Sequence, residues 1–185
     1  QIIFSSTQTN IIVDSSKMPM RALAISNLEN IYILYIKLTR DARGVCWSLN
    51  KKHKKNEEEG LEKDIKSEPI FKTALLWVLH HCITEAVIRK IKSHKIVHIK
   101  YEDVTDNPSH TVQNIWKNYQ LKPQDSSMQS THFKGPKHMV AGNRMRMHKD
   151  IVVKFDNMWK TKMPFLKKII STFLTLPFLK KYNYL

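Results

Sequence analysis

The sequence predicts an α/β fold built on a mainly parallel sheet, and two strands with one helix between them carry that prediction. The run 31–38 is rich in isoleucine, leucine and tyrosine, residues that favour strands, and 96–99 reads IVHI. Between them, over 69–94, apolar side chains recur every four residues, which is typical of a long amphipathic helix. We therefore expect 31–38 to be a buried, parallel strand.

Length and charge limit the class of protein. With 185 residues the chain fits one domain, and 31 Lys and Arg against 16 Asp and Glu give a net charge of +15. This charge favours anionic partners such as nucleotides, sulfated sugars, nucleic acid or anionic lipid, without choosing among them. Cys46 and Cys82 have no zinc or disulfide spacing, which favours a reducing compartment, cytoplasmic over the Golgi lumen.

The end of the strand at 31–38 is the first candidate site. Arg40 and Asp41 follow the strand, and a helix that carries Ser48 in its opening turns is expected next. Ligands of α/β proteins bind at the carboxyl ends of strands, where helix N–H groups face an anion. Arg40 and Ser48 are eight residues apart and would converge on one phosphate. The alternative is a strand-end ion pair of Arg40 with Asp41 or Asp14.

A second strand end is expected upstream. Residues 10–13 form a short apolar run that leads to Asp14, Ser15 and Ser16, and Lys17 follows, so two strand ends would open onto one crevice. There Lys17 would stabilise charge on a leaving group; the alternative is a solvated lysine. A helix is expected from Met18 and Pro19.

The remaining segments have simpler interpretations. The charged stretch 51–66 is a surface loop and 121–136 a connecting loop, while a helix starts near Asp106. His80 and His81 are adjacent on a helix and do not converge on one metal. The segment 164–185 is helical and interrupted by Pro177; we expect it to pack on the sheet, the alternative being an anionic membrane surface.

Five blocks in order resemble the bacterial-type sulfotransferase family: DSSKMPMRA (14–22), LTRDARGVCWS (38–48), YEDV (101–104), HMVAGNRMR (138–146) and LTLPFLKKYNY (174–184). The last block has Tyr182, Asn183 and Tyr184 where that family usually has Tyr-Gly-Tyr. The resemblance implies a three-layer sandwich with a mainly parallel sheet, the P-loop NTPase-like sulfotransferase fold.

The resemblance also implies an activity: transfer of a sulfuryl group from 3′-phosphoadenosine 5′-phosphosulfate to a hydroxyl or amine of a small-molecule or carbohydrate acceptor, with no metal. Arg40 and Ser48 would hold the 3′-phosphate, Arg144 and Arg146 would close over it, and Lys17 would border the transferred group. Arg144 stands where the family commonly has proline. The family's Tyr-Glu-Asp block is mostly structural, and a general base among Glu102 and Asp103 stays open. Ser16 stands where cytosolic relatives carry a catalytic histidine.

The family's loop for the 5′-phosphosulfate has no match among the four glycines of this chain and would lie before residue 1, so the resemblance implies an N-terminally incomplete domain. Two other classes stay open. One is a basic nucleic-acid-binding protein, suggested by the charge and by Trp47, Trp77, Trp116 and Trp159. The other is an inactive sulfotransferase-like scaffold. A membrane anchor is not visible in the sequence.

Overall fold

The computed structural model of the chain describes residues 12–52, 64, 66–91, 96–119, 132–134, 150–152 and 156–185. In chain order the elements are α2 (Pro19–Ile25), β1 (Tyr35–Thr39), α3 (Ala42–Leu49), α4 (Ile70–Lys90), β2 (Ile96–Lys100), α5 (Tyr101–Asp106), α6 (Pro108–Tyr119), β3 (His132–Lys134), β4 (Asp150–Val152), α7 (Met158–Lys162) and α8 (Phe165–Lys181).

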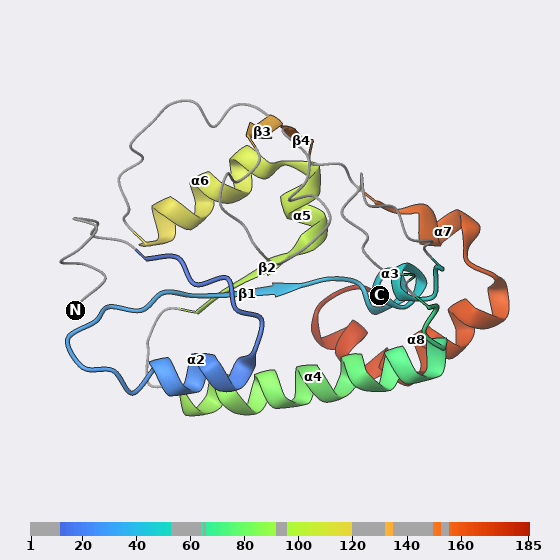
Figure 1. Cartoon of the computed structure of the whole chain (residues 1–185), viewed down its shortest axis with the longest axis horizontal. Coiled ribbons are helices and arrows are strands. Elements are labelled where there is room, and N and C mark those ends of the chain that lie inside the picture. Colours follow the sequence, from blue (N-terminus) through green and yellow to red (C-terminus); the bar gives the residue numbers. More distant parts are fainter. Residues whose placement is uncertain are drawn as a thin grey trace.

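A small parallel sheet lies at the centre of the described structure. Strands β1 and β2 pair in parallel, from Tyr35 beside Ile96 to Thr39 beside Lys100. Helix α4 is the crossover between them, and in Figure 1 α2 and α4 lie on one side of the strands while α5 and α6 lie on the other. The predicted strand, helix and strand are confirmed, and the protein is a mixed helix and sheet structure compatible with the α/β class.

The prediction that the first strand of this pair is buried is wrong on one face. Ile36 and Leu38 are 52% and 55% exposed, whereas Thr39 is only 2% exposed. Successive side chains of a strand point to opposite faces. The face that carries Lys37 and Thr39 contacts α4 and the residues just after α8, whereas Ile36 and Leu38 on the other face are about half exposed.

Two further expectations about strands and loops are corrected. The described part of the expected strand 10–13, Ile12 and Val13, is not in a strand, and these residues are 46% and 86% exposed. The expected loop 121–136 contains β3, which pairs antiparallel with β4. The predicted helix start is confirmed, because α2 begins at Pro19.

Helix α4 packs through a different face from the predicted one. The every-fourth-residue apolar row is largely on the outside: Phe71, Leu75, Leu79 and Ile83 are 59%, 44%, 55% and 39% exposed. The buried face mixes small, aromatic and polar side chains: Ile70, Thr73, Ala74, Trp77, His81 and Val87. Among the described residues α4 alone has the length and hydropathy of a membrane-spanning helix, with 21 residues and a mean hydropathy of 1.2, but core helices also have such values.

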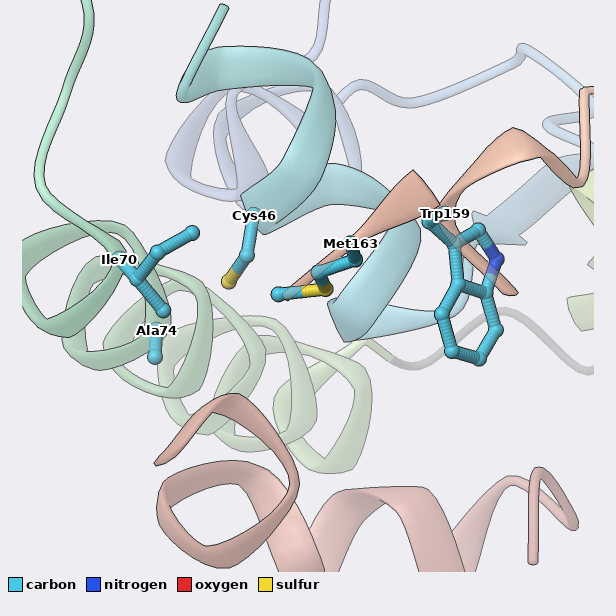
Figure 2. Packing of buried hydrophobic residues seen from close by; sticks show 5 residues of the cluster. All are labelled: Cys46, Ile70, Ala74, Trp159 and Met163. Atoms are coloured by element: carbon cyan, nitrogen blue, oxygen red, sulfur yellow. The ribbon is translucent and has the colours of Figure 1, made fainter. Parts of the chain in front are cut away.

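The core joins α3, α4, α7 and α8. Figure 2 shows Cys46 of α3 and Met163 facing Ile70 and Ala74 of α4, with Trp159 of α7 beyond Met163. A second cluster contains Ala42, Trp77, Leu179 and Tyr182. Burial raises the pKa of the Cys46 thiol to about 12, so this cysteine is a packing residue.

Helix α8 runs through Pro177, which the sequence had suggested as an interruption, and ends in a well-formed cap. Asn183 has a positive φ of 55°. The N–H of Asn183 donates to the carbonyl of Lys180 at 3.1 Å, and that of Tyr184 donates to the carbonyl of Leu179 at 2.9 Å. This is the Schellman pattern, in which a left-handed residue closes the helix.

Candidate functional site

The carboxyl ends of β1 and β2 form the strongest candidate site, called the strand-end site and made of Thr39, Arg40, Asp41, Tyr101 and Glu102. Arg40 follows β1 directly and Tyr101 follows β2 directly. The guanidinium of Arg40 lies over the ring of Tyr101, 4.5 Å from its centroid. The parallel pairing therefore brings both strand exits into contact, at the edge of the sheet where α/β proteins bind ligands.

Arg40 is partly accessible and already has a carboxylate partner. Its Nη2 donates to Asp156 at 3.3 Å, and the two side chains are 25% and 39% exposed. The sequence had left open an ion pair with Asp41 or Asp14. Instead Asp14 pairs with Arg21 at 2.7 Å and Asp41 with Arg43 at 2.7 Å, so both earlier candidates are bound elsewhere.

The N-terminus of α3 is less open to an anion than expected. The Asp41 carboxylate accepts the N–H of Arg43 at 2.8 Å, as an N-cap does, and Glu102 accepts the N–H of Asp41 at 3.1 Å. Two carboxylates therefore occupy donors that we expected to face a ligand. Positive charge for an anion in the strand-end site must come from Arg40.

Ser48 lies in the last turn of α3, not in its opening turns, because α3 spans only Ala42–Leu49. At a rise of about 1.5 Å per residue, six residues separate Ala42 from Ser48 by roughly 9 Å along the helix axis. Ser48 is half-buried. Arg40 and Ser48 thus belong to one strand-helix unit, at opposite ends of its helix.

Lys17 belongs to a different part of the structure. It is exposed and lies just before α2, in a segment organised by Asp14, which accepts hydrogen bonds from the N–H of Ser16 at 2.8 Å and from Arg21 at 2.7 Å. Figure 1 shows α2 and α3 near opposite ends of α4. The structure therefore does not place the Lys17 segment beside α3, and the expected pair of neighbouring strand ends is not formed there.

The basic block 138–146, with Arg144 and Arg146, lies outside the described residues. The two arginines stay predictions from the resemblance. Most of the charged stretch 51–66 also lies outside the described part of the chain.

Residues 183 and 184, which we had not predicted as part of the strand-end site, complete it. The Tyr184 phenol donates to Glu102 at 2.9 Å and lies 3.4 Å from the Thr39 hydroxyl. The backbone carbonyl of Tyr184 accepts a hydrogen bond from the Arg43 guanidinium at 2.9 Å. The Lys100 ammonium donates a hydrogen bond to the backbone carbonyl of Asn183 at 2.9 Å. Both strand ends and the start of α3 are thus held by the segment after α8. The Tyr-Asn-Tyr sequence was the one local sign of this role. The residues that it contacts lie too far away in sequence to be predicted from it.

A partly buried ionic cluster supports the same region from the α4 side. Glu85 accepts hydrogen bonds from Lys37, from Lys181 at 2.6 Å and from the Tyr182 phenol at 2.7 Å. Burial alone would raise the pKa of Glu85, but the hydrogen bonds from Lys181, Lys37 and Tyr182 outweigh burial and lower the pKa to about 2. Glu85 is therefore ionised, and Lys37 is fixed on the inner face of β1.

Two histidines border this cluster. Burial, helped by the charges of His80 and Lys37, lowers the pKa of His81 to about 4, and burial also lowers the pKa of His98. His98 Nε2 lies 2.7 Å from the Thr39 hydroxyl, and His81 Nδ1 lies 3.3 Å from the Tyr182 phenol. Both imidazoles are neutral near pH 7 and act as hydrogen-bonding groups of the scaffold.

Chemically, the strand-end site offers one guanidinium on an aromatic ring, several carboxylates and hydroxyls. Among the described residues, no group of three or more His, Cys, Asp or Glu side chains has the arrangement of a metal site. Glu102 accepts two hydrogen bonds, from Asp41 and Tyr184, which suits a structural carboxylate. Arg40 is the residue of this site best suited to bind an anion.

Comparison with known proteins found no match: no family model, no curated protein and no solved structure is similar to this chain.

Proposed function

We propose that the chain is a sulfotransferase that moves a sulfuryl group from 3′-phosphoadenosine 5′-phosphosulfate to a hydroxyl or amine acceptor. The observation that carries the proposal is the position of Arg40. It lies at the carboxyl end of a parallel strand, before the helix that carries Ser48, and the structure keeps it partly exposed. In the proposed fold, a three-layer sandwich with a P-loop-like sheet, this is where the 3′-phosphate binds.

The backbone of the closing segment is compatible with the resemblance. The sulfotransferase family usually has glycine between its two closing tyrosines, and here Asn183 occupies that place with φ 55°. Glycine adopts this conformation freely, and asparagine is among the few other residues that tolerate it. A left-handed helix cap thus explains the family's Tyr-Gly-Tyr and this chain's Tyr-Asn-Tyr by one backbone geometry.

Arg40 holds the 3′-phosphate in this proposal, and Arg144 and Arg146 close over it. Ser48 is the weaker candidate of the pair that we expected to share the phosphate, because it lies in the last turn of α3. The acceptor oxygen or nitrogen attacks sulfur in line and loses its proton to a base that is not assigned. The sulfur–oxygen bond to the 5′-phosphate breaks, and its electron pair leaves with adenosine 3′,5′-bisphosphate. Lys17 is proposed to stabilise the charge on that leaving oxygen. Because α2 and α3 lie near opposite ends of α4, the role of Lys17 has the least support.

In this mechanism a bound phosphate must compete with Asp156 for the Arg40 guanidinium. A phosphate dianion that binds Arg40 competes with the Asp156 carboxylate, which is 39% exposed and contacts one guanidinium nitrogen at 3.3 Å. Removing the carboxylate should therefore strengthen binding, and removing the guanidinium should weaken it. These opposite effects are expected for any anion that binds Arg40, so they locate the binding site, and the choice of ligand in the titration identifies the anion.

The test is calorimetric titration of the whole chain with adenosine 3′,5′-bisphosphate. We expect Arg40→Ala to weaken binding by about 2 kcal/mol, roughly thirtyfold in Kd, because a charge-assisted contact is lost. Asp156→Asn should tighten binding severalfold, and Ser48→Ala should weaken it less than Arg40→Ala. Arg89→Ala, which removes an exposed arginine in the last turn of α4, is the control and should bind like the parent.

Absence of binding, or equal binding by the parent and Arg40→Ala, would contradict the proposal. Binding without sulfuryl transfer to any acceptor would instead support the inactive scaffold. The nucleic-acid alternative loses part of its basis, because Trp77 and Trp159 are buried and Trp47 and Trp116 are half-buried, so none presents an open stacking surface.

A further inference from the structure

Helix α8 has two opposite faces, and only one of them packs in the described structure. Ser171, Thr175 and Leu179 are fully buried. The opposite side carries the residues that we call the α8 apolar face: Phe165 (74% exposed), Leu166 (71%), Ile169 (48%), Ile170 (44%) and Phe173 (75%).

These five side chains form a continuous stripe. Residues four apart lie on one side of a helix, so Phe165, Ile169 and Phe173 make one row, and Leu166 and Ile170 make the row beside it. Phe165 and Phe173 are each about three-quarters exposed, so covering them with an apolar partner would remove a large apolar area from water and would be favourable. Contiguous exposed apolar surface of this kind marks an interaction site.

The charge around the stripe indicates what covers it. Residues 158–185 contain six lysines and no aspartate or glutamate. Lys160 and Lys162 are exposed just before the stripe, and Lys180 is exposed at the far end of α8. A partner that suits this surface combines an apolar interior with negative charge at its rim.

We propose that the α8 apolar face lies in the interfacial layer of an anionic membrane, with Phe165 and Phe173 among the acyl chains and the flanking lysines on lipid headgroups. Helices with an aromatic and aliphatic face and a basic flank bind such membranes in this way. A second copy of the chain is a poorer occupant, because stacking two such faces brings two sets of lysines together. The segment 164–185 was predicted to pack on the sheet. In the structure the buried face of α8 packs mainly on α3 and α4, and this packing is compatible with the membrane role because it uses the other face.

The test is flotation of the whole chain with two kinds of vesicle, one of phosphatidylcholine alone and one with about a third phosphatidylserine. We expect binding to the anionic vesicles that decreases as salt is raised, and much weaker binding to the neutral ones. Phe165→Ser with Phe173→Ser should weaken binding at least about tenfold, because two inserted side chains are removed. The matched control is Phe71→Ser with Leu79→Ser on α4, where the native side chains are 59% and 55% exposed, and it should bind like the parent.

Far-ultraviolet circular dichroism and thermal unfolding of both double variants check that the helices are intact. Because all four positions are exposed, we expect both to fold. Equal binding to neutral and anionic vesicles, or an equal loss from the α4 and α8 variants, would overturn the proposal. A parent chain that does not float with either kind of vesicle would also overturn it. If light scattering then shows a dimer of the parent that Phe165→Ser with Phe173→Ser abolishes, the occupant of this face is a second copy.

Discussion

The phenol of Tyr184 donates a hydrogen bond to Glu102 at 2.9 Å and so ties the residues after α8 to the turn that follows β2. Burial raises the pKa of Tyr184, which keeps the phenol protonated and able to donate. Glu102 in turn accepts the N–H of Asp41 at 3.1 Å, so the bond also reaches the start of α3. Two hydrogen bonds to the Glu102 carboxylate therefore connect three segments that are remote in sequence.

Loss of the hydrogen bond between Tyr184 and Glu102 should lower the stability of the fold. We expect Tyr184→Phe to lower the free energy of unfolding in urea by about 1 kcal/mol, since a buried hydrogen bond is lost while the ring stays. A double-mutant cycle with Glu102→Gln isolates the pair, and its coupling energy should be at least about 0.5 kcal/mol. Additive effects would mean that the two side chains act independently.

Acid should destabilise the fold through His81. The pKa of His81 is lowered to about 4 in the folded chain from its ordinary 6.5. Between these two pH values the imidazole is protonated in the unfolded chain and neutral in the folded chain. The free energy of unfolding should therefore fall as pH drops from 6.5 to 4. His81→Gln should reduce this slope without abolishing it, because burial also lowers the pKa of His98. Replacing the exposed His110 with glutamine is the control for loss of a surface histidine, and its effect on the slope should be smaller than that of His81→Gln.

A second acid transition is expected at lower pH from Glu85. Its pKa is lowered from 4.5 to about 2, so the stability that the carboxylate contributes is present above pH 4.5 and is lost as pH falls toward 2. Glu85→Gln should flatten the stability profile in this window. Asp14→Asn is a useful comparison, because the pKa of Asp14 is also about 2 but its ion pair with Arg21 is exposed and screened by salt. A larger effect from Asp14 than from Glu85 would contradict the burial argument.

Gly44 should be required by the neighbouring indole. A Cβ at this position would lie 3.1 Å from Cδ1 and 3.2 Å from Nε1 of Trp159, which is buried and stacks with the Arg43 guanidinium. We expect Gly44→Ala to destabilise the protein by about 1 kcal/mol, because overpacking outweighs the gain in helix propensity. In a Trp159→Leu background the same change should become stabilising. An unchanged sign there would show that the indole is not the obstacle.

The cap of α8 gives a prediction about backbone conformation. Asn183→Gly should be neutral or slightly stabilising, because glycine adopts φ 55° without strain. Asn183→Ala should cost about 1 kcal/mol, since a Cβ opposes the left-handed conformation. The Lys100 hydrogen bond reaches the backbone carbonyl of Asn183 and is kept in both variants, so thermal unfolding reports the backbone alone.

Local patterns were enough to predict the central unit of the fold. The strand, helix and strand were found because propensity and period are properties of neighbouring residues, and Arg40 was placed correctly because it follows directly from β1. The extent of burial could not be predicted in this way. Phe71 and Leu79 have the spacing of a buried row, yet α4 packs through Ala74 and Trp77, because the shapes of α3 and α8 decide which face fits.

The partners of the candidate site were hidden for the same reason. Asp156, the ion-pair partner of Arg40, is 116 residues away in sequence, and Tyr184 is 82 residues from Glu102. Local sequence patterns do not predict contacts between residues that are so far apart in the chain. Ser48 was misplaced by a smaller error, because α3 ends at Leu49 and is only eight residues long.

The tie between Tyr184 and the strand exits has a consequence for biosynthesis. Strands β1 and β2 are complete by residue 100, but Asn183 and Tyr184, which hold their ends in place, are synthesised only after α8. A nascent chain paused before residue 184 would carry an unfinished sheet edge and exposed helix faces. Such intermediates are the targets of chaperones, so we expect the newly made protein to depend on chaperones until Tyr184 has emerged.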